Sequence, residues 1–187
     1  MRDEEESGPN AEPAKPNLVL IGFMGVGKSR IGPMCARRLG YAFRDSDHEI
    51  EARVGCAIAE YFAREGEAAF REREREVIAE LTARRETVIA TGGGTVLNPE
   101  NATRLRNSGL VFLLTAPPRQ ILQRVGDTEK RPLLANCPDP LRRIEELLAQ
   151  RTDCYKQTAH YSVNTVRRTP GKIVTEILSL YEEGVRC

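Results

Sequence analysis

A cluster of glycines at the end of an apolar stretch constrains this chain more than any other feature. Residues 20–29 read LIGFMGVGKS, and Gly22 to Ser29 fits the pattern G-x-x-x-x-G-K-[ST] in full. Glycine is unfavourable inside strands and helices, so such a cluster needs a reason. Here it lies between an apolar strand pattern and a helical pattern, the context in which backbone N–H groups and a helix N-terminus wrap an anion. We therefore predict a nucleoside triphosphate site, with Lys28 on the β- and γ-phosphates and Ser29 on Mg²⁺.

Short apolar runs alternate with amphipathic stretches along the chain. We expect helical segments at 28–40, 48–85, 99–107, 117–125 and 170–183, and strands at 17–22, 41–45, 87–91, 110–115 and 160–165. This alternation predicts a three-layer α/β fold, a five-stranded parallel sheet with helices on both faces. Ligands bind such sheets at the carboxyl ends of the strands. The glycine cluster, the DSD of residues 45–47 and the TGGG of residues 91–94 each follow a strand, so we expect them to line one crevice.

The balance of charges argues against some partners. The 187 residues include 28 basic and 27 acidic side chains, a net charge of +1, with no excess that would favour nucleic acid or a membrane surface. The apolar runs are all shorter than the roughly 18 residues of a membrane-spanning helix. The five cysteines are scattered and form no C-x-x-C pair, which indicates reduced thiols in a cytoplasmic protein. We expect a monomer, with residues 1–16 as a disordered acidic leader and residues 17–187 as a single domain.

The class of phosphate-binding protein follows from what accompanies the loop. A GTPase would carry N-K-x-D, which the sequence lacks, and motor ATPases end a second apolar strand in an acidic residue, where this chain has Thr115. The nearest strand-end carboxylates are Asp45 and Asp47, so a P-loop kinase acting on a small molecule is favoured. One carboxylate would hold Mg²⁺ through water, and the other would take a proton from an acceptor hydroxyl. Helix capping is the alternative, because Ser46 to Glu49 fits a capping box.

Two further segments predict an acceptor pocket. Glu74 lies on the apolar stripe of the helix predicted at 48–85, where a carboxylate needs a buried partner. Arg71, three positions earlier, would be held by Glu74 and present its guanidinium to an anionic substrate. The second segment is residues 92–94, three glycines that the helix start at Asn98 and Pro99 does not require. Bare backbone there would let a polar ligand approach the N–H groups closely, whereas a flexible turn is the alternative.

The segment 126–136, GDTEKRPLLAN, is polar and lies between two helical patterns. Phosphoryl transfer needs a site that excludes water, so we expect this segment to be a lid that brings Arg131 inward. An ordinary exposed loop is the alternative.

Together these residues resemble the shikimate kinase family. The resemblance runs from about Asn17 to Tyr181 and is carried, in matching order and spacing, by GFMGVGKS, DSDHEIE, GEAAFREREREV, TGGGTV, RPLL, RTDCY and VNTVRRTPGKIV. The family transfers a phosphoryl group from MgATP to the 3-hydroxyl of shikimate, a step toward chorismate and the aromatic amino acids.

The resemblance also implies roles for individual residues. Asp47, Lys28 and Arg131 are implied in catalysis, and Ser29 and Asp45 on the metal side. The implied shikimate-binding residues are Asp47, Arg71, Gly92, Gly93, Gly94 and Arg151, with the two arginines on the carboxylate. The implied nucleotide-binding residues are Gly25, Val26, Gly27, Lys28, Ser29, Arg30, Arg124, Arg131, Arg168 and Pro170, with Arg124, Arg168 and Pro170 at the adenine.

Three positions depart from the family pattern. Arg30 stands where the family usually has Thr, Asn164 replaces the usual Asp, and Pro33 falls inside the first turns of the helix, which it would bend. These departures concern nucleotide affinity more than reaction type. Two other functions stay open: a related kinase acting on another polyol acid such as gluconate, and a regulatory module that binds nucleotide without catalysis.

Overall fold

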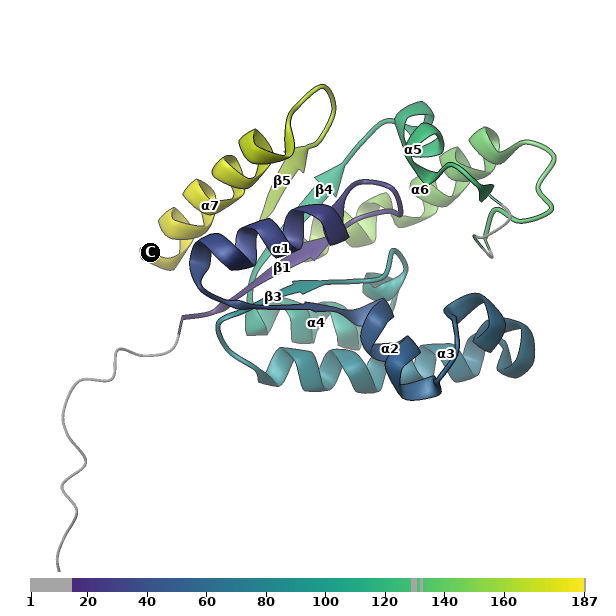
Figure 1. Ribbon diagram of the computed structural model, residues 1–187, viewed down its shortest axis with the longest axis horizontal. Coiled ribbons are helices and arrows are strands. Elements are labelled where there is room, and N and C mark those ends of the chain that lie inside the picture. Colours follow the sequence, from purple (N-terminus) through teal and green to yellow (C-terminus); the bar gives the residue numbers. More distant parts are fainter. Residues whose placement is uncertain (1–14, 129–130, 132, 187) are drawn as a thin grey trace, which may run out of the picture.

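The apolar runs predicted as strands pair into one sheet in the computed structural model, which describes residues 15–128, 131 and 133–186. The strands are β1 (Asn17–Ile21), β2 (Ala42–Asp45), β3 (Thr87–Ala90), β4 (Gly109–Thr115) and β5 (Tyr161–Asn164). Every pairing is parallel, and the spatial order is β2-β3-β1-β4-β5 (Figure 1). Because the chain continues from β1 to strands on both of its sides, a crevice opens at the carboxyl end of β1, where ligands bind such sheets.

Helices cover both faces of this sheet, as predicted. On one face, Leu18 and Leu20 of β1 pack with α1 (Lys28–Leu39) and α7 (Pro170–Arg186). On the other face, Val19 and Ile21 pack with α3 (Ile58–Ala83) and α4 (Pro99–Ser108) (Figure 1). The alternation follows from the strand period of two, which points successive side chains to opposite faces. The three-layer α/β architecture is therefore confirmed.

The predicted helix over 48–85 is two helices in the structure. Helix α2 (Ser46–Val54) ends at Gly55, which has a φ of 71° and donates its N–H to the carbonyl of Glu51. Helix α3 follows and is itself interrupted at Gly66, with a φ of 81°. Both breaks occur at glycines, because a left-handed backbone carries little penalty without a Cβ.

Two further helices lie on either side of the predicted lid. Helix α5 (Pro118–Val125) precedes it, and α6 (Pro140–Thr158) follows it, capped by the Asp139 carboxylate, which accepts the N–H of Arg142. Residues 129, 130 and 132 of the lid, residues 1–14 of the predicted leader and Cys187 lie outside the described residues. None of the helices in the described ranges is long and apolar enough to cross a membrane.

Helix α1 lies against β2 with almost no intervening space. A Cβ at Gly32 would come within 2.3 Å of the Phe43 ring, so only glycine permits this contact. Helix α1 continues through Pro33 without a break. The close contact brings the first turn of α1 to the carboxyl end of β2, where the candidate site begins.

Candidate active site

The loop between β1 and α1 has the form expected of a phosphate-binding loop. Gly22, Gly25 and Gly27 have φ values of 131°, 73° and 106°, which strongly favour glycine. Lys28 begins α1, and its ammonium donates to the carbonyls of Gly22 at 2.7 Å and Phe23 at 2.9 Å. Burial lowers the pKa of Lys28 to about 8, against the opposing pull of the nearby carboxylates. The loop thus holds a buried cation where phosphate oxygens are expected.

Asp45 joins three elements at the end of β2. Its Oδ2 accepts the Ser29 hydroxyl at 2.7 Å, and its Oδ1 accepts the N–H of Asp47 at 3.1 Å, which makes Asp45 the N-cap of α2. Capping therefore occurs at Asp45, one residue before the predicted capping box. Ser46 has a different partner, because its hydroxyl accepts the N–H of Gly92 at 2.9 Å.

The donors near Ser29 fit Mg²⁺, which binds through one or two carboxylates together with waters and substrate phosphates. The Ser29 hydroxyl and the Asp45 carboxylate are such hard oxygen donors, and they lie within hydrogen-bond distance of each other. Within the described residues, no cluster of three or more His, Cys, Asp or Glu side chains offers an all-protein metal cage. This donor set is suited to a metal held partly by a nucleotide.

Asp47 lies beside the glycines of residues 92–94. A Cβ at Gly92 would come within 2.7 Å of the Asp47 Oδ1, so the missing side chain makes room for the carboxylate. Burial and, next, the Asp45 charge raise the pKa of Asp47 to about 6, against the opposing charge of Lys28. A carboxylate with a pKa of about 6 is suited to accept a proton near neutral pH.

The predicted pair of Arg71 and Glu74 forms. Glu74 is only 1% exposed and accepts Arg71 Nη1 at 2.9 Å and the Thr95 hydroxyl at 2.7 Å. Arg71 also donates to Glu67 on the exposed side. A Cβ at Gly94 would come within 3.0 Å of both terminal nitrogens of Arg71. Gly92 and Gly94 therefore make room for the side chains of Asp47 and Arg71. The sequence had suggested a different role for these glycines, close approach of a ligand to their N–H groups.

The Gly93 carbonyl is the meeting point of two donors from α6. Arg151 donates Nη1 at 3.2 Å, and the Tyr155 hydroxyl donates at 2.5 Å. Arg151 is 5% exposed and lies over the Phe23 ring, 5.5 Å from its centroid. Tyr155 was not among the predicted site residues. Two sequence signals could have found it: Tyr155 ends the RTDCY segment, and it follows Arg151 by four residues, which places both on one face of a helix.

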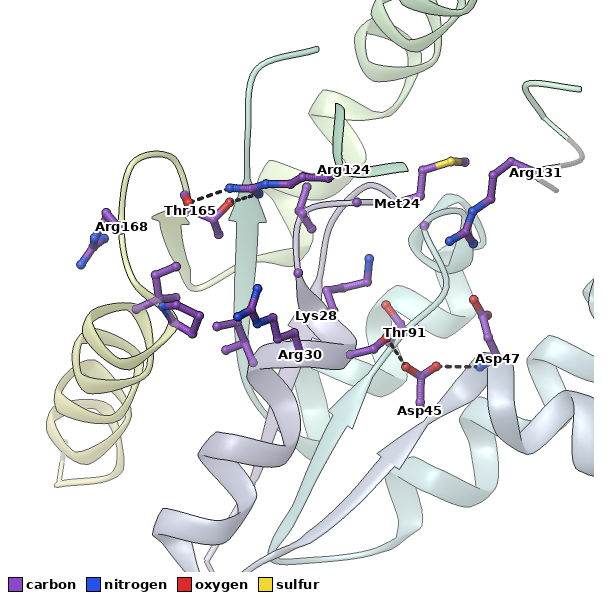
Figure 2. A pocket seen from close by; sticks show the side chains of 18 residues that line it. Met24, Lys28, Arg30, Asp45, Asp47, Thr91, Arg124, Arg131, Thr165 and Arg168 are labelled. Carbon is purple, nitrogen blue, oxygen red and sulfur yellow. Dashed lines mark hydrogen bonds between the residues drawn. The ribbon is translucent and has the colours of Figure 1, made fainter. Parts of the chain in front are cut away.

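Two adjoining cavities occupy the crevice. The first has a volume of about 490 Å³ and the second about 410 Å³. All ten residues predicted to bind nucleotide line the first cavity, together with Thr91 and Thr165 (Figure 2). The second cavity is lined by Arg71, Glu74 and the three glycines, among others. Both cavities share the following lining: Met24, Ser29, Asp45, Asp47, Gly93 and Arg131.

The two arginines predicted to bind the substrate carboxylate have different surroundings in this structure. Among the described residues that line the second cavity, Arg71 is present and Arg151 is not. Arg151 instead donates Nη1 to the carbonyl of Gly93, a residue that does line this cavity.

At the far end of the first cavity, Arg124 and Arg168 both form hydrogen bonds with the turn at the end of β5. Arg124 donates to the hydroxyl of Thr165 at 2.8 Å and to its carbonyl at 2.9 Å. Arg168 pairs with Glu176 and donates to the carbonyl of Asn164. The Asn164 side-chain oxygen accepts the N–H of Val166 at 2.8 Å, a bond that the usual Asp would also accept. The departure at this position therefore preserves the turn.

Lys28, Asp47 and Arg131 point toward one region of the first cavity, the part that it shares with the second (Figure 2). A glycine-rich phosphate loop on a parallel sheet, with a strand-end carboxylate facing an adjoining pocket, defines a P-loop kinase that acts on a small molecule.

Comparisons with known proteins narrow this class. The family model described as shikimate kinase matches residues 24–182. The chain is 45% identical over 166 residues to a shikimate kinase of Ralstonia nicotianae, covering 89% of this chain and 87% of that protein. The chain belongs to the shikimate kinase family.

Solved structures agree with this assignment. The shikimate kinase from Acinetobacter baumannii in complex with shikimate is similar, with a TM-score of 0.87 and 39% identity over 91% of this chain and 94% of that chain. A gluconokinase from Sinorhizobium meliloti gives a TM-score of 0.57 and 17% identity over 94% of this chain and 96% of that chain. At that identity the gluconokinase shows a shared fold alone.

Proposed function

We propose that this protein transfers the γ-phosphate of ATP to the 3-hydroxyl of shikimate, giving shikimate 3-phosphate and ADP in aromatic amino acid biosynthesis. The observation that carries this proposal is the junction of the two cavities, where Asp47 and Arg131 line both. In-line phosphoryl transfer needs an acceptor oxygen and a terminal phosphate to meet at one place, with charge neutralised around them.

The first cavity would hold the nucleotide. The N–H groups of residues 25–29 and the Lys28 ammonium would surround the phosphates, and Arg30 would contribute a further cation. Arg124, Arg168 and Pro170 would contact the adenine, on which a planar guanidinium can stack. Ser29 and Asp45 would hold Mg²⁺, which when bound neutralises charge on the phosphates.

The second cavity would hold shikimate. Arg71, held in place by Glu74, would bind the carboxylate with a charge-assisted hydrogen bond, and Arg151 would join it. Gly93 and Gly94 would lie against the ring, whereas the N–H of Gly92 already has a partner in Ser46. Asp47 would accept the hydrogen bond of the reacting hydroxyl and take its proton.

The segment 126–136 would act as a lid over the phosphates. Its described residues include Leu134, which is buried in the core, and Arg131, whose carbonyl accepts the N–H groups of Leu134 and Ala135. An anchored segment of this kind would deliver Arg131 to the junction of the cavities while excluding water.

We further propose a monomeric cytoplasmic enzyme whose partners are two small molecules, and the cysteines and the net charge are consistent with this. The cysteines among the described residues, Cys35, Cys56, Cys137 and Cys154, are free thiols. The near-neutral net charge offers no general attraction for nucleic acid or for an anionic membrane.

One steady-state assay tests the proposal. ADP formation is measured with MgATP alone, with shikimate and with gluconate. We expect release of ADP that depends on shikimate and not on gluconate. Release with gluconate would assign the site to another polyol acid, and ATP binding without acceptor-dependent ADP release would identify a regulatory module.

A further inference from the structure

Tyr155 has no role in the proposed reaction, yet it makes a short contact with the candidate site. It is 3% exposed, and its hydroxyl donates to the Gly93 carbonyl at 2.5 Å. Gly93 lines both cavities, so this bond connects α6 to the backbone where the two meet. The other donor to the same carbonyl is Arg151, one helical turn earlier on α6.

Because the Gly93 carbonyl has two donors, it stays hydrogen-bonded when either one of them leaves. A carbonyl oxygen has two lone pairs, and it is satisfied when one donor remains. If Arg151 leaves, Tyr155 still pairs the Gly93 carbonyl. If the Tyr155 hydroxyl were missing, departure of Arg151 would leave a buried acceptor unpaired, which is costly.

A substrate carboxylate would be a stronger partner for Arg151 than the Gly93 carbonyl. It now donates to a neutral carbonyl and lies outside the lining of the second cavity, although Gly93 itself belongs to that lining. A guanidinium binds a carboxylate more strongly than a neutral carbonyl, because the bonds are charge-assisted and can be bidentate. An anionic acceptor entering beside Gly93 would therefore draw Arg151 from its present partner.

We infer that Tyr155 is a positioning residue: it keeps the Gly93 carbonyl paired while Arg151 turns from that carbonyl to the carboxylate of the acceptor. The inference rests on the proposed function, because it takes shikimate as the acceptor. The inference goes beyond the proposed function in one respect: the Tyr155 hydroxyl, which would not touch shikimate, increases the affinity for shikimate and leaves the affinity for ATP unchanged.

The test is the Tyr155→Phe variant, which keeps the ring and removes only the hydroxyl. We expect the KM for shikimate to rise on the order of tenfold, with the KM for ATP and kcat changed less than threefold. Tyr181→Phe is the matched control. Tyr181 is 2% exposed, also donates to a backbone carbonyl at 2.5 Å, that of Pro16, and lines neither cavity. This control should leave both KM values unchanged.

A double-variant cycle separates positioning from a general structural effect. In an Arg151→Ala background, Tyr155→Phe should change the shikimate dissociation constant, measured by calorimetry, less than twofold, because the residue through which it acts is gone. An unchanged KM for shikimate in Tyr155→Phe, an equal rise for both substrates, or a full effect in the Arg151→Ala background would each overturn the inference.

A crystal of the wild-type protein with shikimate gives a measurement that needs no variant. The Tyr155 hydroxyl should stay bonded to Gly93 while Arg151 contacts the carboxylate, and Arg151 remaining on Gly93 would overturn the inference. The wild-type ADP assay keeps the two proposals apart. Absence of shikimate-dependent ADP release refutes the proposed function and with it this inference, whereas an active wild type with an unaffected Tyr155→Phe refutes the inference alone.

Discussion

The Ser29 hydroxyl donates a hydrogen bond of 2.7 Å to the Asp45 carboxylate, which joins the first turn of α1 to the end of β2. The other oxygen of that carboxylate caps α2 through the N–H of Asp47. Asp45 therefore combines a structural bond with a negative charge at the proposed metal site. A suitable substitution separates these two contributions.

Asp45→Asn should keep the cap and remove the charge, because Asn and Asp are equally good at N-cap positions. We expect the Mg²⁺ concentration for half-maximal activity to rise about tenfold, with the melting temperature lowered by less than about 4 °C. The measurement is a magnesium titration at saturating ATP and shikimate. An unchanged titration midpoint would remove Asp45 from the metal site.

Asp47→Asn should nearly abolish transfer and alter the pH dependence of stability. In the folded protein, burial and then Asp45 raise the pKa of Asp47 from 3.8 to about 6, so the folded state holds this proton more tightly than the unfolded state. The wild-type free energy of unfolding therefore loses a contribution as pH rises from about 4 to about 6, and the variant avoids that loss.

Thermal unfolding in EDTA checks this, since the carboxylates are then free of metal. The quantity to compare is the melting temperature of Asp47→Asn minus that of the wild type. This difference should be at least about 3 °C larger at pH 7.5 than at pH 4.5. The same difference at both pH values would contradict the raised pKa, and full kinase activity would exclude Asp47 as the base.

Arg131→Ala should lower kcat at least tenfold, which corresponds to about 1.4 kcal/mol in the activation barrier. The reason is loss of a guanidinium at the junction of the cavities, where charge develops during transfer. Arg142→Ala is a matched control, because Arg142 is exposed on α6, pairs with Glu146 and lines neither cavity. Equal kcat values for the two variants would rule out a catalytic lid.

Arg71→Ala should raise the KM for shikimate by about tenfold to a hundredfold and leave the KM for ATP within about twofold. Arg73→Ala provides the comparison on the same helix, since Arg73 pairs with Glu76 at the surface and lines neither cavity. Steady-state kinetics on both substrates make the measurement. A loss of ATP affinity in Arg71→Ala would show that the second cavity is wrongly assigned to shikimate.

Arg30→Thr should raise the KM for ATP about threefold to tenfold, because one cation is removed from the nucleotide cavity. Arg30 lines that cavity, and among the described residues its guanidinium has no hydrogen-bonded or ion-paired partner. The effect should shrink as salt is raised. Arg37→Thr, at an exposed site on the same helix, should leave the KM unchanged, and equal behaviour of the two variants would exclude Arg30 from nucleotide binding.

Local spacing accounts for what the sequence could predict. The phosphate loop is contiguous, the strands alternate with helices, and Glu74 meets Arg71 because three residues of helix bring them together. The N-cap of α4 at Asn98 was likewise predicted from adjacent residues, and its side chain accepts the N–H groups of Glu100 and Asn101.

Contacts between distant segments account for most of what was missed. Gly92 meets Ser46 across 46 residues, and Gly93 meets Tyr155 across 62, so no periodicity reports either bond. The cap at Asp45 was placed one residue late because the same residue both ends a strand and starts a helix. The breaks at Gly55 and Gly66 had a local signal in glycine, but the long apolar stripe outweighed it.

Gly93 is bare main chain at the place where the two cavities adjoin. A methyl group there would approach the Met24 nitrogen to 3.3 Å, a tight contact with the phosphate-binding loop. If the two cavities hold ATP and shikimate as proposed, a single inhibitor with an adenosine end and a cyclohexene carboxylate end would bridge them with a short tether. By confining the second end once the first is bound, it would exploit a high effective concentration that separate inhibitors lack.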